Sequence, residues 1–555
     1  MKVKNYLLVF ATVVVALALF SSCDDDFLER HYEGGTLDDD QIQETVEALP
    51  NRINSSISGM YSLLGKPDGF FDRGSSYRAD DAGYPGIALS QDLNSGNMVN
   101  VVSGYDWFSA ALEYSDRTPT YANPRIRYGL FYKIIYAAND VLSAIPADTD
   151  NKQLIYARGQ AKAMRAFCYL SLAPYFQFKY VGNEDKPSVP IVEEGTDFRN
   201  NPRASLTDLY DYILTNLTDA ISDLEGYVRP NKSAIDQNVA YGLRARAYLN
   251  MEAWSNAAAD ADKAMAGYTP YGISELTKPG FNQATDHNWI WALLLPTDVI
   301  SAGNYATWPS QLGSFSGDAY VAYAGIYRSI NVLLYNKIND TDVRKNWWLD
   351  ENKTSPYLEG LTWEDPATNV VYEGQAIATA SIADVKAPMD AYANVKFGQR
   401  SGIGSAYNDG DWCMMRAEEM ILIKAEALAM GGNPSQGKQV LENFIKTDRD
   451  PSYTTSATSA EDLQNEVWLQ RRIELWGEGF GMSDAMRLGR NIIRYHPNQP
   501  TNVPEDYRFN LSKDDPWLLL RFVQGETNNN VAVEQNEGGA QPSQGDGASL
   551  MDGVI

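Results

Sequence analysis

Residues 205–224 read SLTDLYDYILTNLTDAISDL, and this stretch predicts the class of the fold. Its apolar side chains recur at intervals of three and four residues, which is the spacing of one face of an α-helix. Ser205 stands at the start with Asp208 three positions later, an arrangement typical of a helix N-terminus. The stretch therefore predicts an amphipathic helix with one buried face.

The same periodicity recurs along the chain and predicts an all-α fold. We expect further helices over residues 125–145, 153–176, 233–251, 253–267, 416–430, 436–445 and 460–476, joined in pairs by short turns. In one pair, Ala257, Ala261 and Ala264 share a face behind Trp254. Small side chains at this spacing let two helices approach closely, as in tetratricopeptide hairpins.

Two segments lack the helical pattern and are predicted to be loop-rich. Residues 269–410 are rich in Gly, Asn, Asp, Trp and Tyr and contain short strand-like runs, and residues 65–121 are also irregular. Trp289 and Trp291 alternate in one such run, where we expect them to be core residues. Long loops on a rigid helical scaffold commonly carry function, so candidate binding residues are sought in these two segments.

The first residues of the chain are typical of an export signal. Lys2 and Lys4 precede an apolar run over residues 6–20, and two serines then lead into Cys23. The run is shorter than the roughly 20 residues that span a bilayer, so we expect a signal peptide that is removed. Cleavage by an ordinary signal peptidase, without attachment of lipid, is the alternative to lipidation of the cysteine.

This signal predicts the organisation of the mature protein. Residues 1–22 are the expected lipoprotein signal peptide, and residues 23–555 are the expected single domain, with the loop-rich insertion at about 269–410. Acyl chains on Cys23 would anchor that domain to a membrane. No other apolar run approaches membrane-spanning length.

Composition excludes several classes of function. Lys plus Arg number 46 against 72 Asp plus Glu, giving a net charge of −26, and such an acidic surface repels nucleic acid. Cys168 and Cys413 fall in apolar patterns and predict two buried free thiols. The three histidines lie far apart without zinc-ligand spacing, which argues against a zinc site.

Loop acids raise the question of a bound cation. Asp80 and Asp81 form a pair, and Asp92 lies nearby, but the spacing is not that of a calcium-binding loop. We interpret these residues as solvated loop acids and predict no cofactor. A structural Ca²⁺ is the alternative that the sequence leaves open.

The segment QRRIELWGEGFGMSDAMR at residues 470–487 resembles the C-terminal motif of the SusD/RagB family of outer-membrane nutrient-binding lipoproteins. Gln470 stands where that motif has Glu, and Gly481 where Arg is common. CDDDFLER at 23–30 and MRAEEMILIKAEAL at 415–428 agree with the family in the same order. The arginines and carboxylates of the motif can pair at helical spacings, so we interpret them as structural and not catalytic.

The resemblance implies an architecture and a role. Members of the family have an all-α core of tetratricopeptide-like hairpins with a loop-rich face, here the insertion that carries short strands. They cover a TonB-dependent, SusC-like transporter from the outside of the outer membrane and capture oligosaccharides or, in the RagB branch, peptides. The acidic residues after Cys23 resemble the family's surface-export tag.

Aromatic residues in the two loop-rich segments are the candidate ligand contacts. Sugars present apolar C–H faces ringed by hydroxyl groups, so a glycan site needs exposed Trp or Tyr beside Asp and Asn. The two segments that combine these residue types lie where glycan-binding relatives place their aromatic residues. The candidates are Tyr105, Asp106, Trp107, Asn304, Tyr305, Trp308 and Tyr320.

Three functions follow as hypotheses. The first is a non-enzymatic glycan-binding lipoprotein that serves a transporter, and the second keeps this role with a peptide as cargo. The third is a lipid-anchored glycoside hydrolase, which requires a pair of carboxylates that no segment of the sequence singles out. We predict no catalytic residue.

Overall fold

The computed structural model describes residues 39–67, 69–71, 78–104, 106–296, 306–315, 320–365, 368–403 and 407–555. The predicted signal peptide and Cys23 lie outside the described residues. So do three of the candidate ligand contacts, Tyr105, Asn304 and Tyr305.

Helices dominate the order of elements. The α-helices are α2 (Asp39–Ala48), α3 (Ile53–Ser62), α4 (Tyr84–Asn94), α5 (Ser109–Glu113), α6 (Ala122–Ser143), α7 (Lys152–Phe176), α8 (Leu206–Asp223), α9 (Gln237–Asn250), α10 (Trp254–Ala264), α12 (Trp308–Leu312), α13 (Tyr320–Ala324), α14 (Val332–Tyr335), α15 (Ala376–Thr379), α16 (Ala417–Met430), α17 (Pro434–Asp448), α18 (Ala460–Glu474), α19 (Gly481–Arg487) and α20 (Gln524–Asn529). The strands are β1 (Met98–Asn100), β2 (Trp289–Leu293), β3 (Arg328–Ile330), β4 (Thr362–Glu364), β5 (Val371–Glu373) and β6 (Trp412–Arg416).

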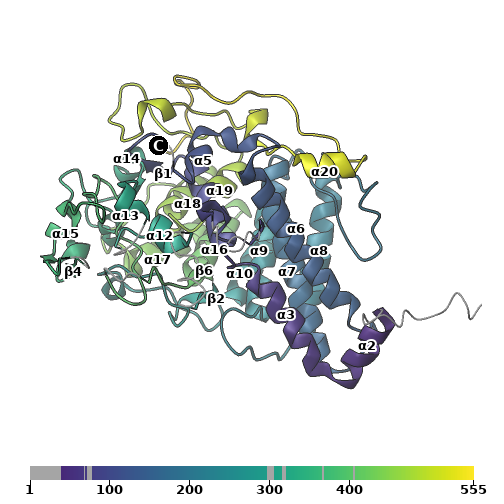
Figure 1. The fold of residues 1–555 in the computed structure, drawn as a ribbon. Coiled ribbons are helices and arrows are strands. Elements are labelled where there is room, and N and C mark those ends of the chain that lie inside the picture. Colours follow the sequence, from purple (N-terminus) through teal and green to yellow (C-terminus); the bar gives the residue numbers. More distant parts are fainter. Residues whose placement is uncertain are drawn as a thin grey trace, which may run out of the picture.

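The long helices pack against one another in the order of the chain. α6 packs on α7, α7 on α8, α8 on α9, α9 on α10, α10 on α16, and α16 on both α17 and α18. Figure 1 shows the helical half around α6, α7 and α8, with the short elements α13, α15 and β4 at the other end of the molecule. The prediction of an all-α fold of tetratricopeptide-like hairpins with a strand-bearing insertion is confirmed.

α8 illustrates how the sequence produces these helices. The hydroxyl of Ser205 accepts a hydrogen bond from the backbone N–H of Asp208 at 3.0 Å, which satisfies one of the free donors of the first turn. Leu209, Ile213 and Leu217 are fully buried on the face that packs against α7 and α9. The predicted N-terminus and the predicted apolar face are both confirmed.

The segment between α10 and α16 joins the helical core through a pair of strands. β2 pairs antiparallel with β6, which leads directly into α16. Trp289 and Trp291 of β2 are buried, as predicted. Cys168 and Cys413 are buried free thiols, which confirms the interpretation made from their apolar surroundings.

A second strand pair joins the two loop-rich segments. β1 follows α4, and β3 lies in the insertion; they pair antiparallel with Met98 opposite Ile330 and Asn100 opposite Arg328. The C-terminal segment after α19 then crosses the top of the molecule in Figure 1 and ends near α14. Among the described residues, no helix has both the length and the apolar character needed to cross a bilayer.

Candidate functional site

The β1 and β3 pair brings the two loop-rich segments to one place. Because the strands are antiparallel and Asn100 lies opposite Arg328, the chain leaves β1 and enters β3 at the same end of the pair. The loop after β1 carries Trp107, and the chain before β3 carries α12 and α13. Two segments far apart in the sequence thus meet where candidate ligand contacts were predicted.

A buried ion pair holds this junction. The carboxylate of Asp106 accepts hydrogen bonds from Arg328 at 2.9 Å and from the side-chain amide of Asn100 at 2.6 Å. Arg328 also donates to Asn100 Oδ1 at 2.6 Å and to the backbone carbonyl of Gln311, in α12, at 3.0 Å. The side chains of Asp106 and Arg328 are 2% and 0% exposed, so Asp106 positions the loop and lacks the exposure that the prediction of a ligand contact assumed.

Trp107 is half-buried at the edge of this junction, and a cation holds its ring. The guanidinium carbon of Arg78 lies 5.6 Å from the centre of the Trp107 ring. Arg78 in turn makes two hydrogen bonds to Asp80, at 2.9 and 2.7 Å. Burial raises the pKa of Asp80, although Arg78 opposes the shift. Asp80 thus holds the guanidinium group of Arg78 in place, and this group in turn orients the indole of Trp107.

Trp308 is buried, so the expectation of an exposed aromatic ring at this position is wrong. The residue is 4% exposed, and its indole N–H donates to the carbonyl of Gly410 at 2.9 Å. Its ring packs edge-on against Phe397 and Trp412, with centroid distances of 5.9 and 5.4 Å. The loop-like sequence around Trp308 forms the short helix α12, which turns the ring into the core.

Tyr320 begins α13 and is half-buried, with its backbone N–H bound to the hydroxyl of Ser310 at 2.9 Å. Tyr323, one turn later, is 56% exposed, and Val102 in the loop after β1 is 49% exposed. These residues supply exposed apolar surface on the two segments that the junction joins.

Three residues of the junction carry no local sequence signal. The contacts of Arg78 with Trp107 and of Arg328 with Asn100 and Asp106 join residues that are close only in the folded chain, so periodicity and motif spacing do not reveal them.

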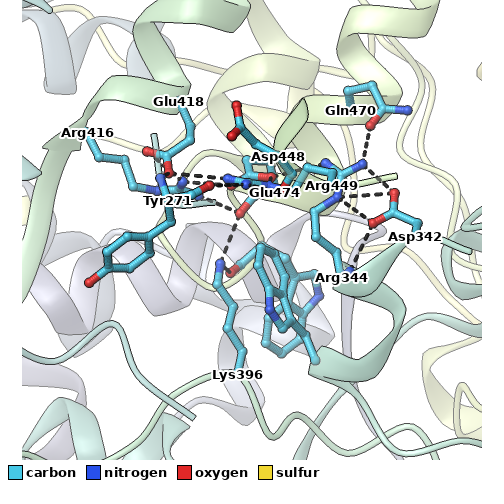
Figure 2. Close-up of polar contacts among 12 residues, drawn as sticks. Tyr271, Asp342, Arg344, Lys396, Arg416, Glu418, Asp448, Arg449, Gln470 and Glu474 are labelled. Carbon is cyan, nitrogen blue, oxygen red and sulfur yellow. Dashed lines mark hydrogen bonds and ion pairs between the residues drawn. The ribbon is translucent and has the colours of Figure 1, made fainter. Parts of the chain in front are cut away.

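The C-terminal motif forms a buried charge cluster, drawn in Figure 2. Glu474, the last residue of α18, pairs with Arg344 at 3.1 Å and with Arg416 and Arg449 at 2.8 Å. All four side chains are at most 1% exposed. Burial alone would raise the pKa of Glu474, but the arginines, Arg449 foremost, hold it well below its usual range.

Lys396 extends the cluster toward the insertion. Its ammonium group donates to the backbone carbonyls of Glu474 and Trp476 at 3.0 and 2.8 Å and to Glu478 at 2.7 Å. Arg416 makes a second ion pair with Glu478 at 2.8 Å. Each charged side chain of this cluster has a partner and is at most 4% exposed. Glu474 and Glu478 pair with residues of other elements and not at helical spacings, and these charges fasten α16, α18 and the insertion.

The loop acids are buried and bonded, which corrects the interpretation of solvated acids. Asp80 and Asp81 are 3% and 0% exposed, and Asp81 accepts from the backbone N–H groups of Phe70 and Phe71 at 3.1 and 3.0 Å. Asp92 accepts from the N–H groups of Gly479 and Gly481. Within the described ranges, no group of three or more His, Cys, Asp or Glu side chains could hold a metal ion.

Sequence families match most of the chain in two blocks. Residues 82–249 match a family described as starch-binding and associating with the outer membrane. Residues 334–538 match the SusD family. The first block contains α4 to α9 with the Trp107 loop, and the second contains the Glu474 cluster.

Individual relatives and solved structures agree with these families. A SusD-like protein of Formosa agariphila is 22% identical over 68% of this chain and 74% of its own length. A SusD-like carbohydrate-binding protein of Bacteroides vulgatus has a TM-score of 0.68 and 22% identity, covering 88% of this chain and 98% of that one. A laminarin-binding SusD-like protein has a TM-score of 0.57 and 16% identity, covering 88% and 99%.

Proposed function

The chain belongs to the SusD/RagB family, and we propose that it captures an oligosaccharide at the cell surface and delivers it to a SusC-like, TonB-dependent transporter. The observation that carries the proposal is the Trp107 ring, held by Arg78 at the junction of the two loop-rich segments. A fixed, partly exposed indole is suited to stacking on the apolar face of a sugar.

The proposed ligand surface divides its residues into two roles. Trp107 and Tyr320 are the proposed contacts among the described residues. Tyr105, close to Trp107 in the chain, and Asn304 and Tyr305, which precede α12, are further proposed contacts. The buried residues Asp106 and Trp308 position these segments and do not themselves contact the ligand. We infer binding without hydrolysis, since Glu474 of the motif is engaged with buried arginines of other elements.

We propose that Cys23 carries the acyl chains that anchor the protein to the outer membrane, with the binding face toward the exterior. The sequence before Cys23 and the outer-membrane association of the matched family support this placement. Metabolic labelling with palmitate tests it, because label should be lost in Cys23→Ala. Label that persists in this variant would contradict the proposal.

Binding of glycans by purified protein tests the ligand surface. We expect wild-type protein to bind a neutral glucan such as laminarin or starch, and Trp107→Ala to weaken binding about tenfold through loss of the stacked ring. Isothermal titration calorimetry measures the affinity. Tyr136→Ala is the matched control, because Tyr136 is 46% exposed on α6, a helix outside the two loop-rich segments, and its removal should leave the affinity unchanged.

Three results would contradict the proposal. Equal affinity of Trp107→Ala and wild-type protein would exclude the Trp107 ring as a contact. Binding of peptides in preference to every glycan would show that the cargo is a peptide, as in the RagB branch. New reducing ends, released from a polysaccharide by the protein, would instead establish a hydrolase.

A further inference from the structure

A cleft with a volume of about 420 Å³ lies in the insertion beside the end of α14. Tyr335 and Tyr392 line it together with Lys345 and the loop over residues 350–356. Pockets that hold small organic ligands have volumes of about 300–1,000 Å³, so the cleft has room for one.

The cleft is separate from the proposed ligand surface around Trp107 and Tyr320, called the Trp107 surface below. The carbonyl of Tyr392 accepts the backbone N–H of Ile330 at 3.1 Å, which places Tyr392 at the Ile330 end of β3. The Trp107 loop is fastened at the other end of the same strand, where Asp106 binds Arg328. The two places therefore flank β3 and do not share a wall residue.

Two half-buried tyrosines form the apolar part of the cleft. The rings of Tyr335 and Tyr392 meet edge to face, with centroids 5.1 Å apart and planes at 66°. The backbone of Tyr392 has a φ of 65°, a conformation that bulky residues seldom adopt. Its hydrogen bond to Ile330 holds it there, and strained positions of this kind cluster at ligand sites.

The polar rim is ordered by its own hydrogen bonds. Asp350 Oδ1 accepts from the backbone N–H groups of Asn352 and Thr354 at 2.9 and 2.8 Å, and Oδ2 accepts from the Thr354 hydroxyl at 2.8 Å. Lys345 binds Asp340 at 2.6 Å, and its nitrogen lies 5.0 Å from the centre of the Tyr335 ring. A rim that is already ordered loses little entropy when a ligand binds.

The charge of the cleft selects among ligands. Asp340, Asp350 and Glu351 line it against one cation, Lys345, so it repels anions. Burial, followed by the charge of Asp350, raises the pKa of Tyr335 to about 12. The Tyr335 phenol therefore stays protonated and can donate a hydrogen bond at neutral pH.

We propose that the cleft between Tyr335 and Tyr392 is a second saccharide site, which takes neutral sugar units and excludes uronic acids and sulfated sugars. The aromatic pair supplies apolar surface for the sugar ring, and the amides, hydroxyls and carboxylates of the rim pair with its hydroxyl groups. The choice of a sugar as ligand rests on the proposed function, whereas the place of the site does not. A polysaccharide that engages both sites would be held more tightly than a short oligosaccharide.

Hydrogen exchange on the full chain separates the two sites. The probes are laminarihexaose and maltohexaose, each added in excess, with an oligomer of uronic acids as the charged comparison. We expect a neutral hexasaccharide to slow exchange over residues 346–356 and 389–395 in wild-type protein and in Trp107→Ala. This protection should vanish in Tyr335→Ala, while protection over residues 100–112 remains.

The outcomes test the second site and the proposed function separately. Protection confined to residues 100–112 would overturn the second site and leave the proposed function intact. Protection confined to the cleft would support the second site and overturn the Trp107 surface. Protection of neither region by either hexasaccharide, or equal protection of the cleft by the uronic acid oligomer, would overturn the second site as proposed.

Further variants test whether a loss of protection reflects lost binding or lost structure. Tyr335→Phe keeps the ring, so we expect it to retain most of the protection, with affinity reduced by no more than about tenfold through loss of one hydroxyl. Tyr335→Ala must retain the wild-type exchange pattern over α6 to α10 in the absence of sugar. If Tyr335→Ala loosens those helices, Tyr392→Ala and Asn352→Ala repeat the test, and unchanged protection of the cleft in both would overturn the proposal.

Discussion

The Glu474 cluster and the Asp106–Arg328 pair are both shielded from water, but they differ in the number of partners. Glu474 is bound by three arginines, and Lys396 and Glu478 extend the cluster. Asp106 has a single arginine, the side-chain amide of Asn100 and the backbone N–H of Phe108. The helical scaffold is thus fastened by many charges, whereas a single buried ion pair joins the two loop-rich segments at the junction. This difference implies that stability and binding can be disturbed separately.

The largest effect is expected at the centre of the cluster. Glu474→Gln removes the negative charge shared by three buried guanidinium groups, and breaking a buried pair in this way costs about 3–5 kcal/mol. Urea unfolding measures the change. Glu461→Gln, an exposed acid in the first turn of the same helix, is the matched control and should change stability by less than about 0.5 kcal/mol. Similar losses in the two variants would refute the structural role of the cluster.

A smaller loss of stability with a clear loss of binding is expected at the junction. Asp106→Asn leaves Arg328 without an ionised partner, although its bonds to Asn100 and Gln311 remain, so we expect a cost of about 2 kcal/mol. The loosened loop should lower glycan affinity about tenfold, and adding Trp107→Ala should lower it little further because both changes act on one surface. Asp219→Asn, in a half-exposed pair with Lys162, is the control. Full additivity of the two changes would mean that Asp106 does not position Trp107.

The smallest effect concerns pH, at the acid that joins the two regions. Asp92 lies in α4 and caps the turn of the C-terminal motif at Gly479 and Gly481. Burial raises its pKa to about 7 from 3.8, so between these values the folded state binds more protons and stability falls as pH rises. Over the last pH unit below 7 we expect the free energy of unfolding to fall by about 1 kcal/mol.

Asp92→Asn should remove this slope, which urea unfolding at several pH values measures. Glu474 gives the opposite dependence, because its pKa is lowered: its contribution is complete above its ordinary value of 4.5 and is lost as pH falls through the lowered value. A wild-type stability that rises between mildly acidic and neutral pH would show that Asp92 does not titrate as described.

The helical scaffold could be predicted because its signals are local. The capping pair Ser205 and Asp208 and the apolar spacing of α8 lie within one segment, and both appear in the structure. The motif at residues 470–487 also indicated paired charges. Its main partners, Arg344, Arg416 and Arg449, come from other elements, so they could not be named from the sequence.

The candidate site was harder to predict, because exposure is a property of the whole fold. Trp107 and Trp308 both lie in loop-like, polar sequence, yet one ring is half-buried and the other is enclosed by Phe397 and Trp412. The acids Asp80 and Asp81 likewise appear exposed in sequence and are buried in the structure. Three-residue strands such as β1 and β3 have no periodicity from which their pairing could be derived.

The pairing of β1 with β3 also determines the stage of folding at which the protein becomes able to bind glycan. Asn100 and Arg328 are separated by 228 positions, and α6 to α10 all lie between them. Contacts of such long range form late, after the intervening chain has closed. Neither half of the chain can build the Trp107 surface alone, so recovery of glycan binding during refolding would report completion of the whole structure.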